Sequence, residues 1–309
     1  MKVMSDPRGF AAVIRRLCAP FLIGSTILTL VACAPKAIPP IPPPPPPQPA
    51  KIAVVLGAGS SKGFAHIGVL KVLETQKIPI HMLVGTSAGS VVGSLYAYGH
   101  DAFKLQTMAL QIEKKDVIDL TIPDNGFIKG EKLEQYINRS VRNTSIENLK
   151  IRFYAVATEV TTGEEVVFAT GNTGKAVRAS CSIPGIFQPV VMSGKTYVDG
   201  GVVSPVAVDV ARRYGADVVI AVDISGGVAG AAPQGTMDTI LQAIDIMYAK
   251  IAAYQIRNAD IVIQPKVGYI GFSDLSKRHE AILEGEKAAV EALPAIQEII
   301  EKLKQEGRL

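Results

Sequence analysis

The stretch that decides the fold class is residues 80–98, which read IHMLVGTSAGSVVGSLYAY. The apolar run at 80–84 is typical of a buried strand, and the pattern at 88–98 is typical of a helix. Between them lies Gly85-Thr86-Ser87-Ala88-Gly89, a G-x-S-x-G sequence. A turn this sharp leaves little room for side chains two positions before and after the serine. The pattern therefore predicts that Ser87 lies on a strained crest at a helix N-terminus.

Apolar runs and amphipathic segments alternate on both sides of this stretch. We predict strands at 52–56, 80–84, 151–157, 165–168, 217–222 and 261–263, and helices at 65–76, 88–98, 206–214, 237–257 and 279–304. Hydrophobic residues make up 48% of the 309 residues, which is enough for a sizeable core. The alternation indicates an α/β fold with a mainly parallel central sheet that helices cover on both faces.

A second glycine-rich turn, GAGSSKG at 57–63, follows the first predicted strand. A dinucleotide fingerprint needs a third glycine where this chain has Lys62. A P-loop needs Gly-Lys followed by Ser or Thr, whereas this chain has Lys62-Gly63. Both phosphate-binding interpretations therefore fit poorly. The main-chain N–H groups of Gly59, Ser60 and Ser61 are instead candidates for an oxyanion hole. An ordinary strand-to-helix turn is the alternative.

Three motifs in this order carry a family resemblance: the glycine-rich turn ending in Lys62-Gly63, the G-x-S-x-G sequence, and Asp199-Gly200-Gly201. They resemble the signatures of the patatin-like phospholipase family, and the stretches 64–70, 126–130 and 179–185 are also similar. The resemblance spans Lys51 to about Asp223. It implies a patatin-like three-layer architecture and a serine acyl hydrolase acting on (lyso)phospholipids or related lipids. It also implies that Ser87 is the nucleophile and that Asp199 takes its proton.

Two other functions stay open at this point. Ser87, an acid and His279 would reproduce the chain order of an α/β-hydrolase triad, although the charged stretch 276–280 favours a solvated histidine. A catalytically idle protein that binds lipid or another protein is the second alternative, with Asp199 then an ordinary turn residue. Because no cluster of Cys, His and acidic residues has metal-ligand spacing, we expect no metal and no other cofactor.

The N-terminal region reads as a targeting segment followed by a spacer. Basic residues precede an apolar run too short to span a bilayer, and Leu30-Val31-Ala32-Cys33 resembles the bacterial lipobox. We therefore expect a signal peptide at 1–32, a lipidated Cys33, a proline-rich linker to residue 50, and a catalytic domain at 51–309. We expect the proline-rich linker to adopt polyproline II. By resemblance to the sorting rule of Gram-negative lipoproteins, Ala34 after the cysteine favours attachment to the outer membrane, with the domain facing the periplasm.

The distribution of charge limits the classes of partner, and the number of cysteines limits the possible disulfides. Most of the formal net charge of +4 comes from residues before Ala32, and no dense basic patch follows, so we exclude nucleic acid. The expected partners are a lipid substrate and the membrane that holds the anchor, while the oligomeric state stays open. Only Cys181 remains in the predicted domain, which excludes an internal disulfide there.

Overall fold

The computed structural model describes residues 46–122, 125–226 and 233–309. The predicted signal peptide at 1–32, Cys33 and the linker up to Pro45 lie outside the described residues. The unit that carries the predicted catalytic domain runs from Pro46 to Leu309.

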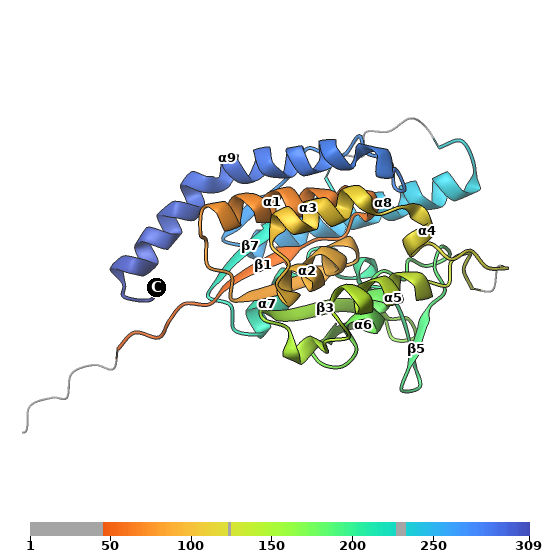
Figure 1. Ribbon diagram of the computed structural model, residues 1–309, viewed down its shortest axis with the longest axis horizontal. Coiled ribbons are helices and arrows are strands. Elements are labelled where there is room, and N and C mark those ends of the chain that lie inside the picture. Colours follow the sequence, from red (N-terminus) through yellow and green to blue (C-terminus); the bar gives the residue numbers. More distant parts are fainter. Residues whose placement is uncertain (1–45, 123–124, 227–232) are drawn as a thin grey trace, which may run out of the picture. The chain divides into compact units, whose positions relative to one another are not determined.

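The centre of this unit is a mixed sheet with the strand order β5-β6-β3-β2-β1-β7-β8 and β4 paired with β3 (Figure 1). Its strands are β1 (Ile52–Leu56), β2 (Met82–Thr86), β3 (Arg152–Glu159), β4 (Glu165–Phe168), β5 (Val190–Met192), β6 (Lys195–Asp199), β7 (Val218–Val222) and β8 (Ile261–Ile263). The strands β3, β2, β1, β7 and β8 are mutually parallel, whereas β4, β5 and β6 run antiparallel to their neighbours. The prediction of a mainly parallel α/β sheet is confirmed.

Helices cover both faces of the sheet (Figure 1). They are α1 (Phe64–Thr75), α2 (Ala88–Tyr98), α3 (Ala102–Gln111), α4 (Lys114–Val117), α5 (Glu131–Ser140), α6 (Thr173–Ser180), α7 (Val208–Arg213), α8 (Thr236–Gln255) and α9 (Arg278–Gln305). Ile52, Val54 and Leu56 of β1 are buried with α1, α2 and α9, while Ala53 and Val55 are buried with α7 and the end of α8. Because successive side chains of a strand point to opposite faces, the continuous apolar run of β1 supplies both cores.

The two ends of this unit meet at the amino ends of the parallel strands (Figure 1). The amide of Ala50 donates to the carbonyl oxygen of Arg308 over 2.9 Å. Asp217, just before β7, accepts from the amide of Lys51 at one carboxylate oxygen and from the guanidinium of Arg308 at the other. The loops that leave the carboxyl ends of β1 and β2 lie at the opposite edge of the sheet.

None of the helices in the described part of the chain combines the length and apolarity needed to cross a membrane.

Candidate active site

The serine of the G-x-S-x-G sequence lies between β2 and α2 with a strained backbone. Ser87 has φ 52° and ψ −122°, a left-handed conformation that side chains with a Cβ rarely adopt. A Cβ on Gly85 would lie 2.6 Å from Cα of Ser90, and one on Gly89 would lie 2.0 Å from the carbonyl oxygen of Leu56. The flanking glycines are thus required for the close approach of strand and helix that holds the serine.

The aspartate of the Asp-Gly-Gly sequence reaches this serine through the register of the sheet. Thr86 of β2 pairs with Val156 of β3, and the next residue of β3, Ala157, pairs with Asp199 at the end of β6. Ser87 and Asp199 therefore flank β3 at the same level. The Oγ of Ser87 donates to Oδ2 of Asp199 over 2.5 Å, and both residues are buried.

The surroundings of Asp199 set its proton affinity. Burial raises the pKa of this carboxyl to about 7, while hydrogen bonds from the hydroxyl of Ser87 and the amide of Gly201 pull the pKa down. The amide of Gly201 donates to Oδ1 over 2.7 Å. A carboxylate with this pKa is ionised in part near neutral pH and is a stronger base than an exposed aspartate, so it can take a proton from a neighbouring hydroxyl.

A second serine fixes the main chain of the first. The Oγ of Ser180 accepts from the amide of Ser87 over 2.9 Å and donates to the carbonyl oxygen of Val156 over 2.6 Å. Two residues on, the carbonyl oxygen of Ser182 accepts from the amide of Asp199 over 2.8 Å. The stretch 179–185 thus holds both members of the Ser87–Asp199 pair, a role that its sequence alone did not reveal.

The glycine-rich turn after β1 supplies main-chain donors, and the partners of these amides differ from one residue to the next. Among the described residues, no group accepts a hydrogen bond from the amides of Gly59 and Ser60. The amide of Ser61, in contrast, donates to the carbonyl oxygen of Phe272 over 3.2 Å. Its hydroxyl also donates to the Gly271 carbonyl over 2.6 Å. Ser61 therefore anchors the turn, and of the three predicted donors the amides of Gly59 and Ser60 are the ones left free for an incoming oxygen.

Two buried side chains hold this turn in place. Nζ of Lys62 lies 2.9 Å from a carboxylate oxygen of Asp245 in α8, and the side chains are only 3% and 17% exposed. Nε2 of His66 lies 2.8 Å from the carbonyl oxygen of Gly57. Burial lowers the pKa of His66 to about 4, so the imidazole is neutral at pH 7 and donates through Nε2.

The imidazole required by the triad alternative is absent from this arrangement. His279 is exposed at the start of α9, and in the described part of the chain it makes no hydrogen bond to Ser87 or Asp199. His81 accepts from the amide of Ile52, and His100 contacts the carbonyl oxygen of Ser140. The base nearest to the Ser87 hydroxyl is therefore a carboxylate.

Apolar cavities begin at the glycine-rich turn. One has a volume of about 430 Å³ and the other about 200 Å³, and both are lined by Ser60 and Ser61 of the turn. The walls that they share are Val117, Ile118, Phe187 and Leu275. Met237 and Leu241 of α8 line the larger one, within the helix that we predicted from its amphipathic pattern. A space of this size and lining is suited to an apolar chain.

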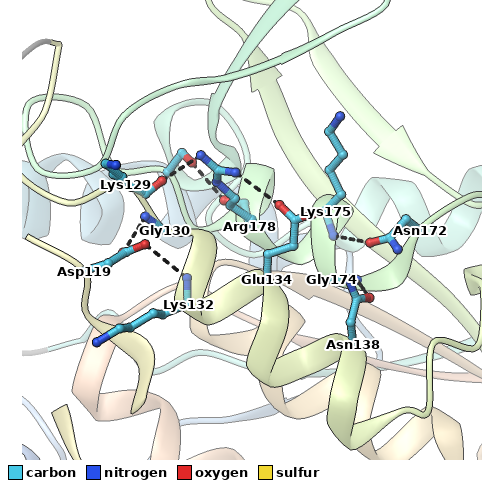
Figure 2. Close-up of polar contacts among 11 residues, drawn as sticks. Asp119, Lys129, Gly130, Lys132, Glu134, Asn138, Asn172, Gly174, Lys175 and Arg178 are labelled. Atoms are coloured by element: carbon cyan, nitrogen blue, oxygen red, sulfur yellow. Dashed lines mark hydrogen bonds and ion pairs between the residues drawn. The ribbon is translucent and has the colours of Figure 1, made fainter. Parts of the chain in front are cut away.

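A polar network joins the loop after α4 to α5 and α6 (Figure 2). Asp119 accepts from the amides of Gly130 and Lys132, which ties the loop after α4 to the start of α5. Arg178 of α6 donates to the carbonyl oxygen of Lys129 over 2.7 Å and pairs with Glu134 of α5. The stretch 126–130, which the sequence singled out without a role, thus fixes α5 to α6 beside Phe187.

Tyr248 of α8 also reaches the site and was not predicted from the sequence. Its side chain is 4% exposed and packs with Ala58 and Ile183. A Cβ on Gly201 would lie 2.3 Å from Cζ of Tyr248, so the ring lies directly over the second glycine of the Asp-Gly-Gly sequence.

Comparisons with known proteins point to one family. The family model described as patatin-like phospholipase matches residues 54–212. The chain is 35% identical over 181 residues to patatin-like phospholipase domain-containing protein 6 of Mus musculus, which covers 56% of this chain and 13% of that protein. It is 33% identical over 195 residues to lysophospholipase NTE1 of Coccidioides immitis, covering 61% of this chain and 12% of that protein.

A bacterial relative matches more of its own length. The chain is 35% identical over 184 residues to an uncharacterized NTE family protein of Mycobacterium bovis, covering 59% of this chain and 51% of that protein. The chain thus spans between 12% and 51% of the length of these three relatives. Among solved structures, VipD from Legionella pneumophila is similar, with a TM-score of 0.49 and 13% identity, over 81% of this chain and 67% of that chain.

Proposed function

Because this chain belongs to the patatin-like phospholipase family, we propose that it is a serine acyl hydrolase in which Ser87 and Asp199 form the catalytic dyad. The observation that carries the proposal is the 2.5 Å hydrogen bond between the Ser87 hydroxyl and the buried Asp199 carboxylate. The strained backbone of Ser87 and the unoccupied amides of the turn after β1 support it.

In the first half of the reaction, Oγ of Ser87 attacks the carbonyl carbon of the ester and passes its proton to Asp199. The carbonyl oxygen gains the negative charge, which the amides of Gly59 and Ser60 stabilise as hydrogen-bond donors. The bond to the leaving oxygen then breaks, the alcohol leaves with the proton from Asp199, and an acyl ester remains on Ser87.

In the second half, water replaces the alcohol. Asp199 accepts a proton from the attacking water while the water oxygen forms a bond to the acyl carbon. The acyl–Oγ bond breaks, Oγ of Ser87 regains the proton, and the free acid leaves. The carboxylate of Asp199 thus acts as the general base, the role that imidazole has in a triad. Its raised pKa of about 7 makes Asp199 suitable for this role.

The proposed substrates are esters of long-chain fatty acids, with (lyso)phospholipids first among them. The apolar cavity of about 430 Å³ beside the turn supports an acyl chain as the bound group. The printed name of the Coccidioides relative, lysophospholipase, supports a lysophospholipid.

Hydrolysis by the full chain tests this proposal. We expect release of fatty acid from lysophosphatidylcholine and of nitrophenol from p-nitrophenyl butyrate. Both activities should be lost in Ser87→Ala and Asp199→Asn and kept in His279→Ala. Loss of activity in His279→Ala would instead support a Ser-acid-His triad. A wild-type chain inactive on both esters would support a catalytically idle protein that binds lipid or another protein.

We also propose that the chain is a lipoprotein of the bacterial envelope, tethered through Cys33 to the outer membrane and facing the periplasm. The lipobox-like sequence and the proline-rich residues after it support this location. Membrane fractionation tests it: Cys33→Ser should release the chain from the membrane fraction, whereas Cys181→Ser should leave its distribution unchanged.

A further inference from the structure

The hydroxyl of Tyr248 is buried beside the dyad without a hydrogen bond. Among the described residues, no group is paired with this oxygen, although its residue is only 4% exposed. A buried hydroxyl without a partner costs roughly 1–3 kcal/mol, so such groups are rare outside functional sites. We therefore expect another state of the protein in which the Tyr248 hydroxyl makes a hydrogen bond.

The neighbour of this hydroxyl is the carboxylate of Asp199. The ring of Tyr248 lies over Gly201, whose amide donates to Oδ1 of Asp199 over 2.7 Å. Burial and then the charge of Asp199 raise the pKa of Tyr248, while Tyr248 lowers the pKa of Asp199. Asp245 on the same helix and Cys181 after α6 also face Tyr248, and Lys62 neutralises Asp245.

The reaction itself removes a donor from Asp199. At rest, Oδ2 accepts from the Ser87 hydroxyl and Oδ1 from the amide of Gly201. Once Ser87 is acylated, its Oγ carries no proton, and an ionised, fully buried carboxylate is left with one donor. The desolvation cost of such a carboxylate is large unless a second donor replaces the first.

We propose that Tyr248 is a positioning residue whose hydroxyl donates to Asp199 in the acyl-enzyme, taking over from the hydroxyl of Ser87. At rest the Tyr248 hydroxyl is close enough to lower the pKa of Asp199 but makes no hydrogen bond of normal geometry, whereas Oδ2 accepts from Ser87. Its hydrogen bond keeps Asp199 ionised and oriented toward the attacking water, so it accelerates deacylation more than acylation. This inference rests on the proposed function.

Pre-steady-state hydrolysis of p-nitrophenyl butyrate by the full chain separates the two steps. The burst of nitrophenol reports acylation, and the later steady rate reports deacylation. For Tyr248→Phe we expect a burst rate within about threefold of wild type and a deacylation rate at pH 7 reduced about tenfold, the loss of one charge-assisted hydrogen bond. Because Tyr248 lowers the pKa of Asp199, the variant's deacylation should recover at higher pH, with its acid limb moved upward.

The matched control is Tyr254→Phe, which removes the hydroxyl of a 68% exposed tyrosine on the same helix and should leave both rates and the pH profile unchanged. If Tyr248→Phe does not fold, replacement of the nine tyrosines by 3-fluorotyrosine gives a second measurement. A more acidic hydroxyl donates more strongly, so the acid limb of deacylation should move to lower pH.

The outcomes distinguish the inference from the function on which it rests. A folded Tyr248→Phe variant with wild-type deacylation at every pH overturns the inference alone. The inference is also overturned if the acid limb of the deacylation rate lies at the same pH in the fluorotyrosine protein as in the wild type. A wild-type chain that gives neither burst nor turnover overturns the proposed function and the inference with it.

Discussion

The hydroxyl of Ser87 lies 2.5 Å from the carboxylate of Asp199, although 112 positions separate the two residues in the sequence. Among the described residues, neither end of this contact touches a histidine, so the proposed acid–base chemistry depends on one buried carboxyl. The pKa of this carboxyl, about 7, predicts a specific pH dependence of the proposed activity.

We predict an acid limb in ester hydrolysis centred near pH 7. Asp199 must be deprotonated to accept the proton of Ser87, so kcat/KM should fall about tenfold per pH unit below this value. Hydrolysis of p-nitrophenyl butyrate by the wild-type chain between pH 5 and pH 9 checks this. A rate that stays flat down to pH 5 would contradict the assignment of the base.

The same carboxyl should weaken the fold at alkaline pH. Because its folded pKa lies above its ordinary value of 3.8, Asp199 favours the folded state at low pH, and this contribution is lost as the pH rises from about 4 through about 7. Asp199→Asn should therefore raise the free energy of unfolding by about 1–3 kcal/mol at pH 8 and by much less at pH 5. Denaturant unfolding at both pH values measures this, and the exposed Asp209→Asn should show no such difference.

The buried ion pair behind the glycine-rich turn should contribute to both stability and rate. Lys62→Met leaves the carboxylate of Asp245 largely buried without its cation, which should cost about 3 kcal/mol of unfolding free energy and lower kcat. The double variant Lys62→Met/Asp245→Leu should recover most of the stability. Lys287→Met, which breaks an exposed pair with Glu284, should cost at most about 1 kcal/mol. Equal losses in the two single variants would show that burial of the pair is unimportant.

The turn that holds the nucleophile should not tolerate a methyl group. Gly89→Ala places a Cβ 2.0 Å from the carbonyl oxygen of Leu56, so strand and helix must separate and Ser87 must move. We expect activity to fall by at least about a hundredfold, since small displacements of a nucleophile have effects of this size. Gly235→Ala is the control, because a Cβ there meets nothing within 4 Å and its φ of −172° suits any residue. Nitrophenyl ester hydrolysis and thermal unfolding of both variants test the prediction, and near-normal activity in Gly89→Ala would contradict it.

Filling the larger cavity should shorten the preferred acyl chain. Leu241 lines it, so Leu241→Trp should lower kcat/KM for a dodecanoyl ester about tenfold while it changes that for a butyryl ester by less than about threefold. Ile246→Trp, at a position 42% exposed on the same helix, should leave the ratio of the two values unchanged. An unchanged ratio in Leu241→Trp would place the acyl chain elsewhere.

The buried parallel strands could be predicted from sequence because each contains a run of apolar residues. β5 and β6 were not predicted, because these strands have only three and five residues and β6 is held by its pairing with β3, about 40 positions earlier. The Asp-Gly-Gly motif still identified Asp199. The four helices α3 to α6 were also not predicted, since each is short and has few buried apolar residues or a weak pattern.

Other features of the site could not be predicted because they also depend on long-range contacts. The amide of Ser61 donates to Phe272, which lies 211 positions away, and no local pattern indicates this contact. The helix around Tyr248 was predicted at 237–257, close to its observed bounds. Nothing in its amphipathic pattern distinguishes the tyrosine over Gly201 from the exposed Tyr254.

The meeting of Ala50 with Arg308 has a practical consequence for handling the protein. Both termini of the described unit emerge from the side of the sheet away from Ser87, one strand length or roughly 17 Å below it. A fluorescent tag, an affinity resin or a solid support attached after Leu309 should therefore leave Ser87, the proposed nucleophile, open to large substrates such as vesicles.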